Sequence, residues 1–350
     1  MSHTTKIGFG IVGTGLVADY HAQAIGETPG ASLIGAADLL ENRVRHFAEK
    51  HGADYWTTVV EDLVNRPDIQ VVCITTPSGA HLEPALLAIH AGKHLVVEKP
   101  LEVTLERVDT LLRAAEQAGV RVTAIFQNRF GPGAQNVKAA LEQGRFGRLV
   151  LGSAYVKWHR PREYYRNNWH GSLTLDGGGA LMNQGIHAVD LLQWFAGMPT
   201  EVFGWTTRCI HTGIEVEDTA TAVLRFAGGA LGAIEASTAV FPGWARRLEI
   251  CGEHGSVALE DDQVTRWDFR EQLPGDKLVT SAGTTDRGRS GASSPEIGYK
   301  GHLLQIQDMV AALRDNREPV INGHAGRNAV ALVRAIYESA AAEVPVKLAP

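Results

Sequence analysis

Ile7–Ala18 reads IGFGIVGTGLVA, and this stretch decides the fold of the first part of the chain. Residues 6–12 form a short β-type run, the next six residues match G-x-G-x-x-A, and a helical stretch follows to about Glu27. In such a strand–turn–helix unit Gly13 makes the tight turn, Gly15 lets a pyrophosphate approach the backbone, and Ala18 allows the helix to pack closely on the strand. The stretch therefore predicts a dinucleotide-binding βαβ unit.

The second strand favours NAD as the dinucleotide. The turn that contains Thr14 and Leu16 begins a helix whose free N–H groups and positive dipole end suit phosphates. Residues 32–37 form a β-type run that leads into Asp38, 25 residues past the first glycine of the turn. A carboxylate there can accept a hydrogen bond from a ribose 2′-hydroxyl and would repel a 2′-phosphate, so we expect NAD rather than NADP. Arg43, one turn into the next helix, is expected to meet the adenine or a phosphate.

Strands and helices keep alternating to about residue 128. The β-type runs at 69–75, 94–97 and 121–126 are separated by helical stretches, which is typical of a doubly wound parallel sheet. Ligands bind such sheets at the carboxyl ends of the strands. We therefore expect residues 1–128 to form a Rossmann-type NAD-binding domain. Its cofactor site is expected to include the residues that follow these strands, which are Thr76, Pro77, His81, Glu98, Lys99 and Asn128.

Lys99 differs from an ordinary mobile surface lysine, because it stands at a strand end directly before Pro100. A following proline biases Lys99 toward extended backbone. Beside a bound nicotinamide the positive charge of NAD⁺ and desolvation would both favour the neutral amine, which can then exchange a proton. The alternative is a lysine that merely follows a strand at the surface.

Beyond residue 128 the pattern changes. The β-type runs are joined by turns such as AGG and GEHG, which favour antiparallel hairpins. Two amphipathic helices, at about 302–315 and 326–343, close the chain. We expect residues 129–350 to form an α+β domain for substrate binding and oligomerisation, with an open, mostly antiparallel sheet and helices on one face, so that the whole chain belongs to the α/β class. The runs lie at residues 149–158, 200–210, 220–226, 230–239, 246–251 and 255–260.

A polar stripe is predicted in Asp176–Asp190, which reads DGGGALMNQGIHAVD. The glycine triplet lets backbone or ligand approach closely. In a helix of 3.6 residues per turn, Asn183, His187 and Asp190 fall on one face. Histidine is well suited to accept and return a proton near neutral pH. The alternative is a histidine satisfied inside the core, next to a glycine-rich turn.

Aromatic and basic residues are combined in 158–169, which reads WHRPREYYRNNW. Sugars present hydroxyls to charged donors and flat C–H faces to aromatic rings, and an arginine can also hold a carboxylate or a phosphate. This composition fits a carbohydrate-binding wall that also includes Arg129 and Asp190. The alternative is a loop that packs one domain on the other. The predicted wall residues in the segment are Trp158, Arg160, Tyr164, Tyr165 and Trp169.

The composition excludes several other classes of protein. With 44% hydrophobic and 21% charged residues and a net charge of −6, the chain is an ordinary globular protein with no basic run for nucleic acid or an anionic membrane. No apolar segment approaches the length of a membrane span. Three widely spaced cysteines indicate a reducing compartment. Because no signal peptide is apparent, we expect a cytoplasmic protein, and we expect no metal site.

The motifs together resemble the glucose–fructose oxidoreductase / inositol dehydrogenase / MocA family over nearly the whole chain. The resemblance implies hydride transfer between NAD(P) and a carbinol of a sugar, cyclitol or sugar nucleotide, with Lys99 and His187 as the proton-transfer residues. It also implies a second-domain sheet that forms dimer and tetramer interfaces. The residues that carry the resemblance are Gly13, Gly15, Ala18, Asp38, Thr76, Pro77, His81, Glu98, Lys99, Pro100, Gly177, Gly178, Gly179, Asn183, His187 and Asp190.

One residue departs from the family pattern, because many members carry aspartate where this chain has Asn183. Asparagine can hydrogen-bond the substrate hydroxyl but supplies no charge to a neighbouring histidine. The choice of proton acceptor between His187 and Lys99 therefore stays open. We expect Asn183→Asp to be tolerated, because a carboxylate at this position would pair with His187. The neighbouring residues look most like members that oxidise C3 of glucosides, anhydrosugars or nucleotide-linked sugars.

The sequence therefore predicts an NAD-dependent dehydrogenase of a secondary alcohol, whose partners are a small carbohydrate, nucleotide sugar or cyclitol substrate and further copies of the same chain. Lys99 or His187 would take the hydroxyl proton, and Asn183 would orient the hydroxyl. Two alternatives remain. One is an NAD-dependent glycosidase that works by transient oxidation and elimination. The other is a nucleotide-sensing regulator that does no chemistry, which would need neither Lys99 nor His187.

Overall fold

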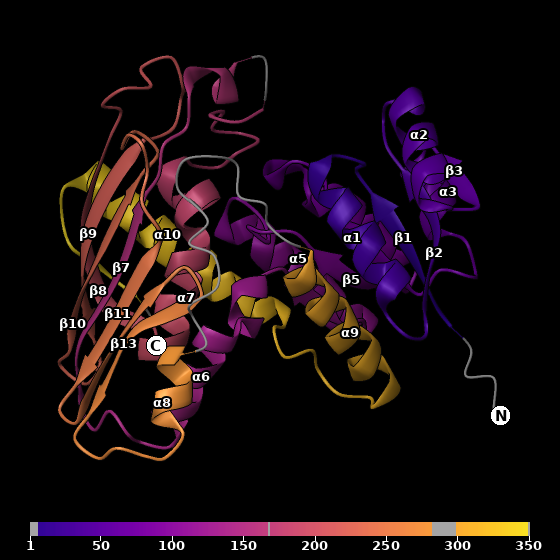
Figure 1. Cartoon of the computed structure of the whole chain (residues 1–350). Coiled ribbons are helices and arrows are strands. Elements are labelled where there is room, and N and C mark those ends of the chain that lie inside the picture. The colour runs from indigo at the N-terminus through magenta and orange to yellow at the C-terminus, as the bar shows by residue number, and fades with distance from the viewer. Residues whose placement is uncertain (1–5, 167–168, 282–298, 349–350) are drawn as a thin grey trace. The chain divides into compact units, whose positions relative to one another are not determined.

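The computed structural model describes residues 6–166, 169–281 and 299–348. They form two compact units. Figure 1 shows the chain coloured by residue number. The first contains the described parts of 1–127 and 298–327, and the second those of 128–297 and 328–350.

The first unit is built on a six-stranded, fully parallel sheet of order β3-β2-β1-β4-β5-β6. This is the strand order of the dinucleotide-binding doubly wound fold, as expected. Every residue of β4 is buried, because helices cover both faces of such a sheet. The strands are β1 (Ile7–Val12), β2 (Ala31–Ala37), β3 (Tyr55–Thr57), β4 (Val71–Ile74), β5 (His94–Val97) and β6 (Val122–Ala124).

Helices and short turns connect these strands. The boundaries follow local sequence signals: α5 is capped by Thr104, whose hydroxyl accepts the Arg107 N–H, and it ends at Gly119 in the left-handed conformation. The connecting elements are α1 (Leu16–Glu27), α2 (Glu41–His51), α3 (Val60–Val64), η1 (Ser78–Ala80), α4 (Leu82–His90) and α5 (Leu105–Ala118).

Helix α9 (Lys300–Arg314) belongs to the first unit, whereas the sequence had assigned it to the second domain. Its apolar face, with Ile306, Met309 and Val310, shares one hydrophobic core with Phe9 and with residues of α1. The amphipathic pattern of α9 is visible in the sequence, but a pattern does not say which sheet the apolar face covers. Helix α10 (Gly323–Ala342) then leads from the first unit into the second.

The second unit contains an eight-stranded sheet of order β13-β12-β11-β7-β10-β9-β8-β14. Only the β7–β10 pair among these is parallel, so the expected open, mostly antiparallel sheet is confirmed. The strands are β7 (Leu149–Lys157), β8 (Pro199–Thr207), β9 (Thr219–Phe226), β10 (Leu231–Ser237), β11 (Arg247–Gly252), β12 (Gly255–Glu260), β13 (Gln263–Phe269) and β14 (Val346–Lys347).

One face of this sheet is covered by helices, as Figure 1 shows for α6, α7, α8 and α10. Buried and exposed residues alternate along β9, so that Ala222 and Leu224 are buried while Val223 is 52% exposed. The described residues leave the other face of the sheet open. None of the helices in the described ranges is long and apolar enough to cross a membrane. The remaining elements are η2 (Gln127–Phe130), α6 (Pro132–Glu142), η3 (Arg162–Tyr165), the π-helix η4 (Ala180–Gly185), α7 (Ile186–Ala196) and α8 (Asp276–Ser281).

Candidate functional site

The glycine turn of the first unit has the shape that a dinucleotide requires. Gly13 has φ +90°, and a Cβ at this position would lie 2.8 Å from the Thr76 nitrogen, so the turn packs tightly against the end of β4. A Cβ on Gly15 would meet no atom of the described residues within 4 Å. No described side chain caps α1 at Gly15, and Leu16 is 69% exposed. The N–H groups at the start of α1 are therefore open to a phosphate.

Asp38 lies directly beside this turn. Its Oδ2 accepts hydrogen bonds from the Thr14 N–H at 2.7 Å and the Thr14 hydroxyl at 2.9 Å, and its Oδ1 accepts the Leu40 N–H at 3.0 Å. Arg43 Nη1 is 3.9 Å from Oδ2. The carboxylate is thus fixed at the end of β2, where it can select against a 2′-phosphate.

His81 is 1% exposed and joins two neighbouring turns of the first unit. Its Nε2 lies 3.0 Å from the carbonyl oxygen of Thr76, and its Nδ1 lies 3.0 Å from that of Pro100. Burial lowers the pKa of His81, so the imidazole is neutral and donates to one of these carbonyls at a time. His81 therefore holds the turns that follow β4 and β5, and Pro77 directly precedes η1 in the first of them.

Glu98 is also buried, and it forms a trio with His21 of α1 and His302 of α9. Its Oε1 lies 2.9 Å from His21 Nε2 and 3.2 Å from His302 Nε2. Among the described residues these side chains are close enough to hold a metal ion. Metal-bound histidines usually donate their second ring nitrogen to a partner, but within the described part of the chain neither Nδ1 has one. The geometry therefore favours hydrogen bonds from the Nε2–H groups of both imidazoles to the Glu98 carboxylate.

The glycine triplet of the second unit is packed against protein. A Cβ on Gly178 would lie 2.2 Å from the Tyr337 hydroxyl, and one on Gly179 would lie 1.8 Å from the Glu217 carbonyl oxygen. The buried Glu217 carboxylate accepts the Gly179 N–H at 2.9 Å, the Leu181 N–H at 2.8 Å and the Tyr337 hydroxyl at 2.8 Å. This carboxylate caps the start of the π-helix η4, where a negative charge is favourable. The triplet thus makes room for the cap.

Asn183 lies in η4 and contacts two residues that the sequence analysis did not assign to the site. Its Nδ2 donates to the carboxylate of Asp176 and lies 3.2 Å from His170 Nδ1. Asp176 is 1% exposed and also accepts the Gly171 N–H at 2.7 Å. Because η4 is π-helical, the predicted spacing of 3.6 residues does not hold at Asn183. Asp176 precedes the glycine triplet in sequence, which is the one signal that could have drawn attention to it.

Arg160 continues this polar network. It is 7% exposed, its Nη2 donates to the Gln184 side-chain oxygen at 2.7 Å, and its guanidinium lies over the rings of Trp158 and Tyr164 at 5.2 and 5.5 Å. Gln184 in turn donates to the Tyr164 hydroxyl at 2.9 Å and to the Asn183 oxygen at 3.1 Å. Residues of the predicted wall and of the glycine-rich helix therefore form one hydrogen-bonded group.

The phenols of this group are not proton acceptors. Burial raises the pKa of Tyr164 above its usual value and that of Tyr165 to about 12. The Tyr165 hydroxyl donates to Thr238 at 2.9 Å. Tyr164 stacks on His170 with ring centroids 4.5 Å apart, and Trp169 lies 3.9 Å from the same imidazole. The two tyrosines can bind or orient a ligand but remain protonated at neutral pH.

Arg129 and Asp190 were both predicted to line the sugar wall, but the structure pairs them with each other. Arg129 Nε donates to Oδ2 of Asp190 at 2.8 Å, and Nη2 donates to Oδ1 at 2.6 Å. Arg129 is 5% exposed and Asp190 is 1% exposed. A bidentate pair at this depth ties η2 to α7, and each group already has an opposite charge as its partner.

The two predicted proton-transfer residues lie in different units. Lys99 follows β5 in the first unit and is partly buried, and the Lys99–Pro100 peptide bond is cis. His187 stands in the first turn of α7 in the second unit and is also partly buried. Asn128 lies in η2, directly after the sheet of the first unit.

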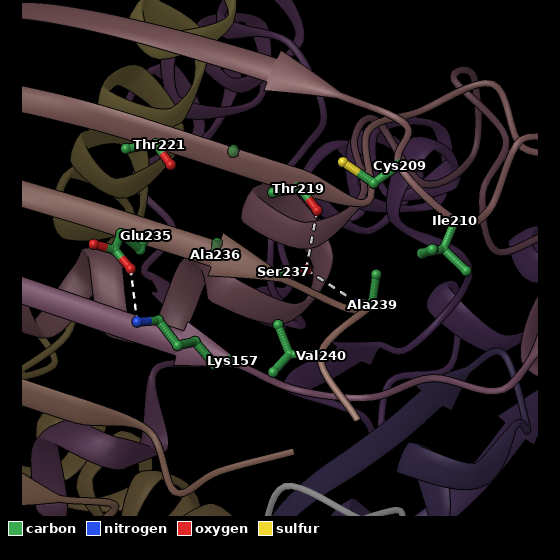
Figure 2. A pocket seen from close by; sticks show the side chains of 11 residues that line it. Lys157, Cys209, Ile210, Thr219, Thr221, Glu235, Ala236, Ser237, Ala239 and Val240 are labelled. Atoms are coloured by element: carbon green, nitrogen blue, oxygen red, sulfur yellow. Dashed lines mark hydrogen bonds and ion pairs between the residues drawn. The ribbon is translucent and has the colours of Figure 1, made fainter. Parts of the chain in front are cut away.

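A cavity of about 280 Å³ lies elsewhere, at the ends of β7, β9 and β10 (Figure 2). Gly185 of η4 packs against Ala236, so Glu235 and Ser237 point to the opposite face of the sheet. Lys157 pairs with Glu235 at 2.8 Å, as Figure 2 shows. None of the predicted site residues lines this cavity, which belongs to the open face.

Comparison with known proteins identifies the family. Residues 7–126 match the family model "Oxidoreductase family, NAD-binding Rossmann fold", and residues 134–258 match "GFO/IDH/MocA C-terminal domain". The chain belongs to the GFO/IDH/MocA family of oxidoreductases. The predicted family, the NAD-binding Rossmann fold and the oxidoreductase class are thereby confirmed.

Several dehydrogenases are similar to this chain over nearly the full length. The WlbA dehydrogenase from Bordetella pertussis, solved in complex with NADH and UDP-GlcNAcA, is 33% identical with a TM-score of 0.91, over 99% of both chains. Myo-inositol 2-dehydrogenase from Thermotoga maritima is 25% identical over 97% of this chain and 98% of its own. Levoglucosan dehydrogenase from Pseudarthrobacter phenanthrenivorans is 25% identical over 97% of both.

Proposed function

We propose that this protein is an NAD-dependent dehydrogenase that oxidises a secondary alcohol of a nucleotide-linked sugar carrying a carboxylate. The proposed substrate class rests on the similarity of this chain to the WlbA dehydrogenase, which binds NADH and UDP-GlcNAcA. That similarity is 33% over 99% of the chain, against 25% for the inositol and levoglucosan enzymes. Cyclitols and anhydrosugars are therefore the second candidate class of substrate.

The residues of the first unit fit the cofactor. Gly13 and Gly15 would receive the pyrophosphate at the open start of α1, and Asp38 would accept a hydrogen bond from the adenosine ribose. Bound NAD⁺ supplies a hydride acceptor. The protein must then bind the alcohol, orient it and take its hydroxyl proton.

Arg160 is the residue that we propose to hold the substrate carboxylate. Its guanidinium is buried, and Gln184 and the His159 carbonyl oxygen each accept one of its N–H groups, at 2.7 and 3.2 Å. No carboxylate among the described residues forms an ion pair with it within 4 Å. A buried arginine without an anion is costly, so an anionic ligand would be bound favourably.

Proton transfer is proposed for Lys99 or His187, as the family resemblance implies. Tyr164 and Tyr165 stay protonated, so they are excluded as the base. His170 is a third candidate that only the structure revealed, because it contacts Asn183 and approaches Asp176 to 3.9 Å.

The substrate test follows the absorbance of NADH with a panel of alcohols. UDP-GlcNAcA should give net NADH, and UDP-GlcNAc, which lacks the carboxylate, should react less well. Arg160→Gln should remove most of this preference. Net NADH from myo-inositol or levoglucosan, but from neither nucleotide sugar, would overturn the substrate class. Glycoside cleavage without net NADH would instead support the glycosidase alternative.

The proton-transfer test uses Lys99→Ala, His187→Ala and His170→Ala. Loss of the acid–base residue should lower kcat by about 10²–10⁴-fold, while NAD affinity stays near wild type. NAD affinity is measured separately by quenching of tryptophan fluorescence. Near-wild-type turnover of Lys99→Ala and His187→Ala with the best substrate would remove both residues from the chemistry.

We also propose that the protein is a homo-oligomer assembled through the open face of its second sheet. Leu231 and Leu151 are in register on the β7–β10 pair, 53% and 49% exposed, and Val223 adds a third apolar side chain on β9. Contiguous exposed apolar side chains on a sheet favour a partner surface. The family resemblance points to the same face.

A further inference from the structure

The turn that carries Lys99 is fastened on both sides by buried histidines. On one side, the Glu98 Oε2 accepts the Lys99 N–H at 3.1 Å, and the other carboxylate oxygen meets His21 and His302. On the other side, His81 contacts the carbonyl oxygen of Pro100 at 3.0 Å. The three histidines are 0%, 2% and 1% exposed.

The carboxylate of Glu98 is the centre of this arrangement. The titratable groups that face it are His21 from α1, His302 from α9, His81 at the start of α4 and Cys73 from β4. His302 lies edge-on to His21 with ring centroids 5.1 Å apart, and it also contacts the ring of Tyr20 at 5.7 Å. No lysine or arginine of the described residues forms an ion pair with Glu98. The N–H groups of two imidazoles are therefore what compensates the burial of this carboxylate.

A buried carboxylate held in this way cannot rotate freely. If Glu98 turned, it would lose the histidine donors, and a buried ion deprived of its partners is strongly disfavoured. The backbone N–H of Lys99 donates a hydrogen bond to the same carboxylate. The position of the Lys99 peptide therefore depends on His21 and His302, which are 77 and 204 residues away from Glu98 in sequence. A support fixed by buried hydrogen bonds is what a proton-transfer side chain requires.

We propose that Glu98, His21 and His302 are positioning residues for Lys99: two imidazoles clamp the carboxylate, and the carboxylate fixes the peptide that carries the lysine. This inference rests on the proposed role of Lys99 in proton transfer. None of the three needs to touch substrate. The competing explanation is that the trio only stabilises the core of the first unit.

The first experiment replaces His302 by glutamine and by asparagine, whose side-chain amides differ in length. In His302→Gln the side-chain N–H lies the same number of bonds from the backbone as the histidine Nε2, whereas in His302→Asn it is one bond short. The control is His324→Asn, which removes an exposed histidine–glutamate contact of 3.1 Å to Glu116 in the same unit. Hydrogen exchange of the Lys99 amide, read from overlapping peptides by mass spectrometry, needs no substrate. We expect exchange about ten-fold faster or more in His302→Asn, and near-wild-type exchange in His302→Gln and His324→Asn.

The second experiment measures turnover and asks whether the effect passes through Lys99. His302→Asn should lower kcat by about 10–100-fold with the KM for NAD nearly unchanged, because only the reacting geometry is lost. His302→Gln should restore most of kcat. In the Lys99→Ala background, His302→Asn should have no further effect on kcat, since the residue that it positions is gone.

The outcomes separate this inference from the proposed function. If His302→Asn lowers kcat by the same factor with and without Lys99, or if Lys99 exchange is unchanged, the trio does not position Lys99. If Lys99→Ala turns over normally, the proposed role of Lys99 fails, and the exchange data still decide whether the trio holds the turn. Should His302→Asn not fold, His21→Asn and His21→Gln make the same comparison from α1.

Discussion

The side-chain amide of Asn183 donates a hydrogen bond to the buried carboxylate of Asp176. This contact changes the expectation for aspartate at position 183, which the sequence predicts to be tolerated. Asn183→Asp would place two carboxylates in contact, and one of them would have to bind a proton, so its pKa would rise. We expect the variant to lose about 1–3 kcal/mol of unfolding free energy at pH 8.

The loss in Asn183→Asp should shrink at lower pH. A raised pKa in the folded state means that the folded protein binds more protons than the unfolded one, so stability is regained as the pH falls through that pKa. Urea unfolding at pH 8 and pH 5.5 measures this difference. Asn183→Ala is the control, because it loses the same donor without adding a charge. Equal losses for Asn183→Asp at the two pH values would contradict the shared proton.

The buried Arg129–Asp190 pair should govern stability. Asp190→Asn leaves the guanidinium buried without its anion, which costs about 3–5 kcal/mol of unfolding free energy. Asp68→Asn is the matched control, because it breaks an Arg66–Asp68 pair at the surface and should cost less than about 1 kcal/mol. Denaturant unfolding of both variants makes the comparison. If Asp190→Asn is as stable as the wild type and only its KM for the substrate is raised, the pair instead contributes to binding the sugar.

Asp38 should discriminate between the two cofactors. Its carboxylate is fixed by Thr14, so a 2′-phosphate would meet a charge that cannot move away. Asp38→Ala should lower kcat/KM for NAD and raise the NADP-to-NAD ratio of kcat/KM, because it removes both an acceptor and a repulsive charge. Thr14→Val removes only one hydroxyl bond and should keep the preference for NAD. Equal use of the two cofactors by the wild type would show that the Asp38 argument is wrong.

Stability should begin to fall on the acid side near pH 6.5. Burial lowers the pKa of His21 and of His81, so the unfolded chain takes up protons there below about pH 6.5 and the folded chain does not. For Glu98, burial would raise the pKa, but the hydrogen bonds from His21 and His302 hold it well below its usual value. Its stabilising contribution is therefore present above about pH 4.3 and is lost below that.

Thermal unfolding between pH 8 and pH 5 tests the histidine part of this window. His21→Gln keeps an N–H donor for Glu98 but cannot titrate, so its midpoint temperature should fall less between pH 7 and pH 5.5 than that of the wild type. His324→Gln, at an exposed site, should follow the wild type. A wild-type midpoint temperature that stays constant over this interval would contradict the interpretation that His21 and His81 are buried in their neutral form.

The oligomer should depend on the open face of the second sheet. Leu231→Glu places a charge beside Leu151 on that face and should shift the protein to a smaller species in light scattering at micromolar concentration, with an unchanged circular dichroism spectrum. Val320→Glu, which alters a 60% exposed residue of the first unit, is the control. A wild-type protein that is monomeric under these conditions would refute the assembly.

Local signals were sufficient to predict the strand, turn and carboxylate that we propose to bind the cofactor. The strand, the turn glycines and Asp38 all lie within residues 6–38, and a turn glycine is required wherever the backbone adopts a conformation such as that of Gly13. Alternation of strands and helices then indicated a parallel sheet. Each of these features depends on periodicity or on backbone conformation, which a short window of sequence contains.

The partners of the buried polar groups were decided only by the tertiary structure. The sequence singled out Asp190, Asn183, Glu98 and the glycine triplet, but it did not show that these groups pair with Arg129, Asp176, His302 and Glu217. The Glu98–His302 contact spans 204 residues. A buried charge must find its partner among whatever groups the packed chain brings within about 3 Å, because water is excluded there. That selection depends on how the elements within each unit pack, and no local pattern of residues encodes it.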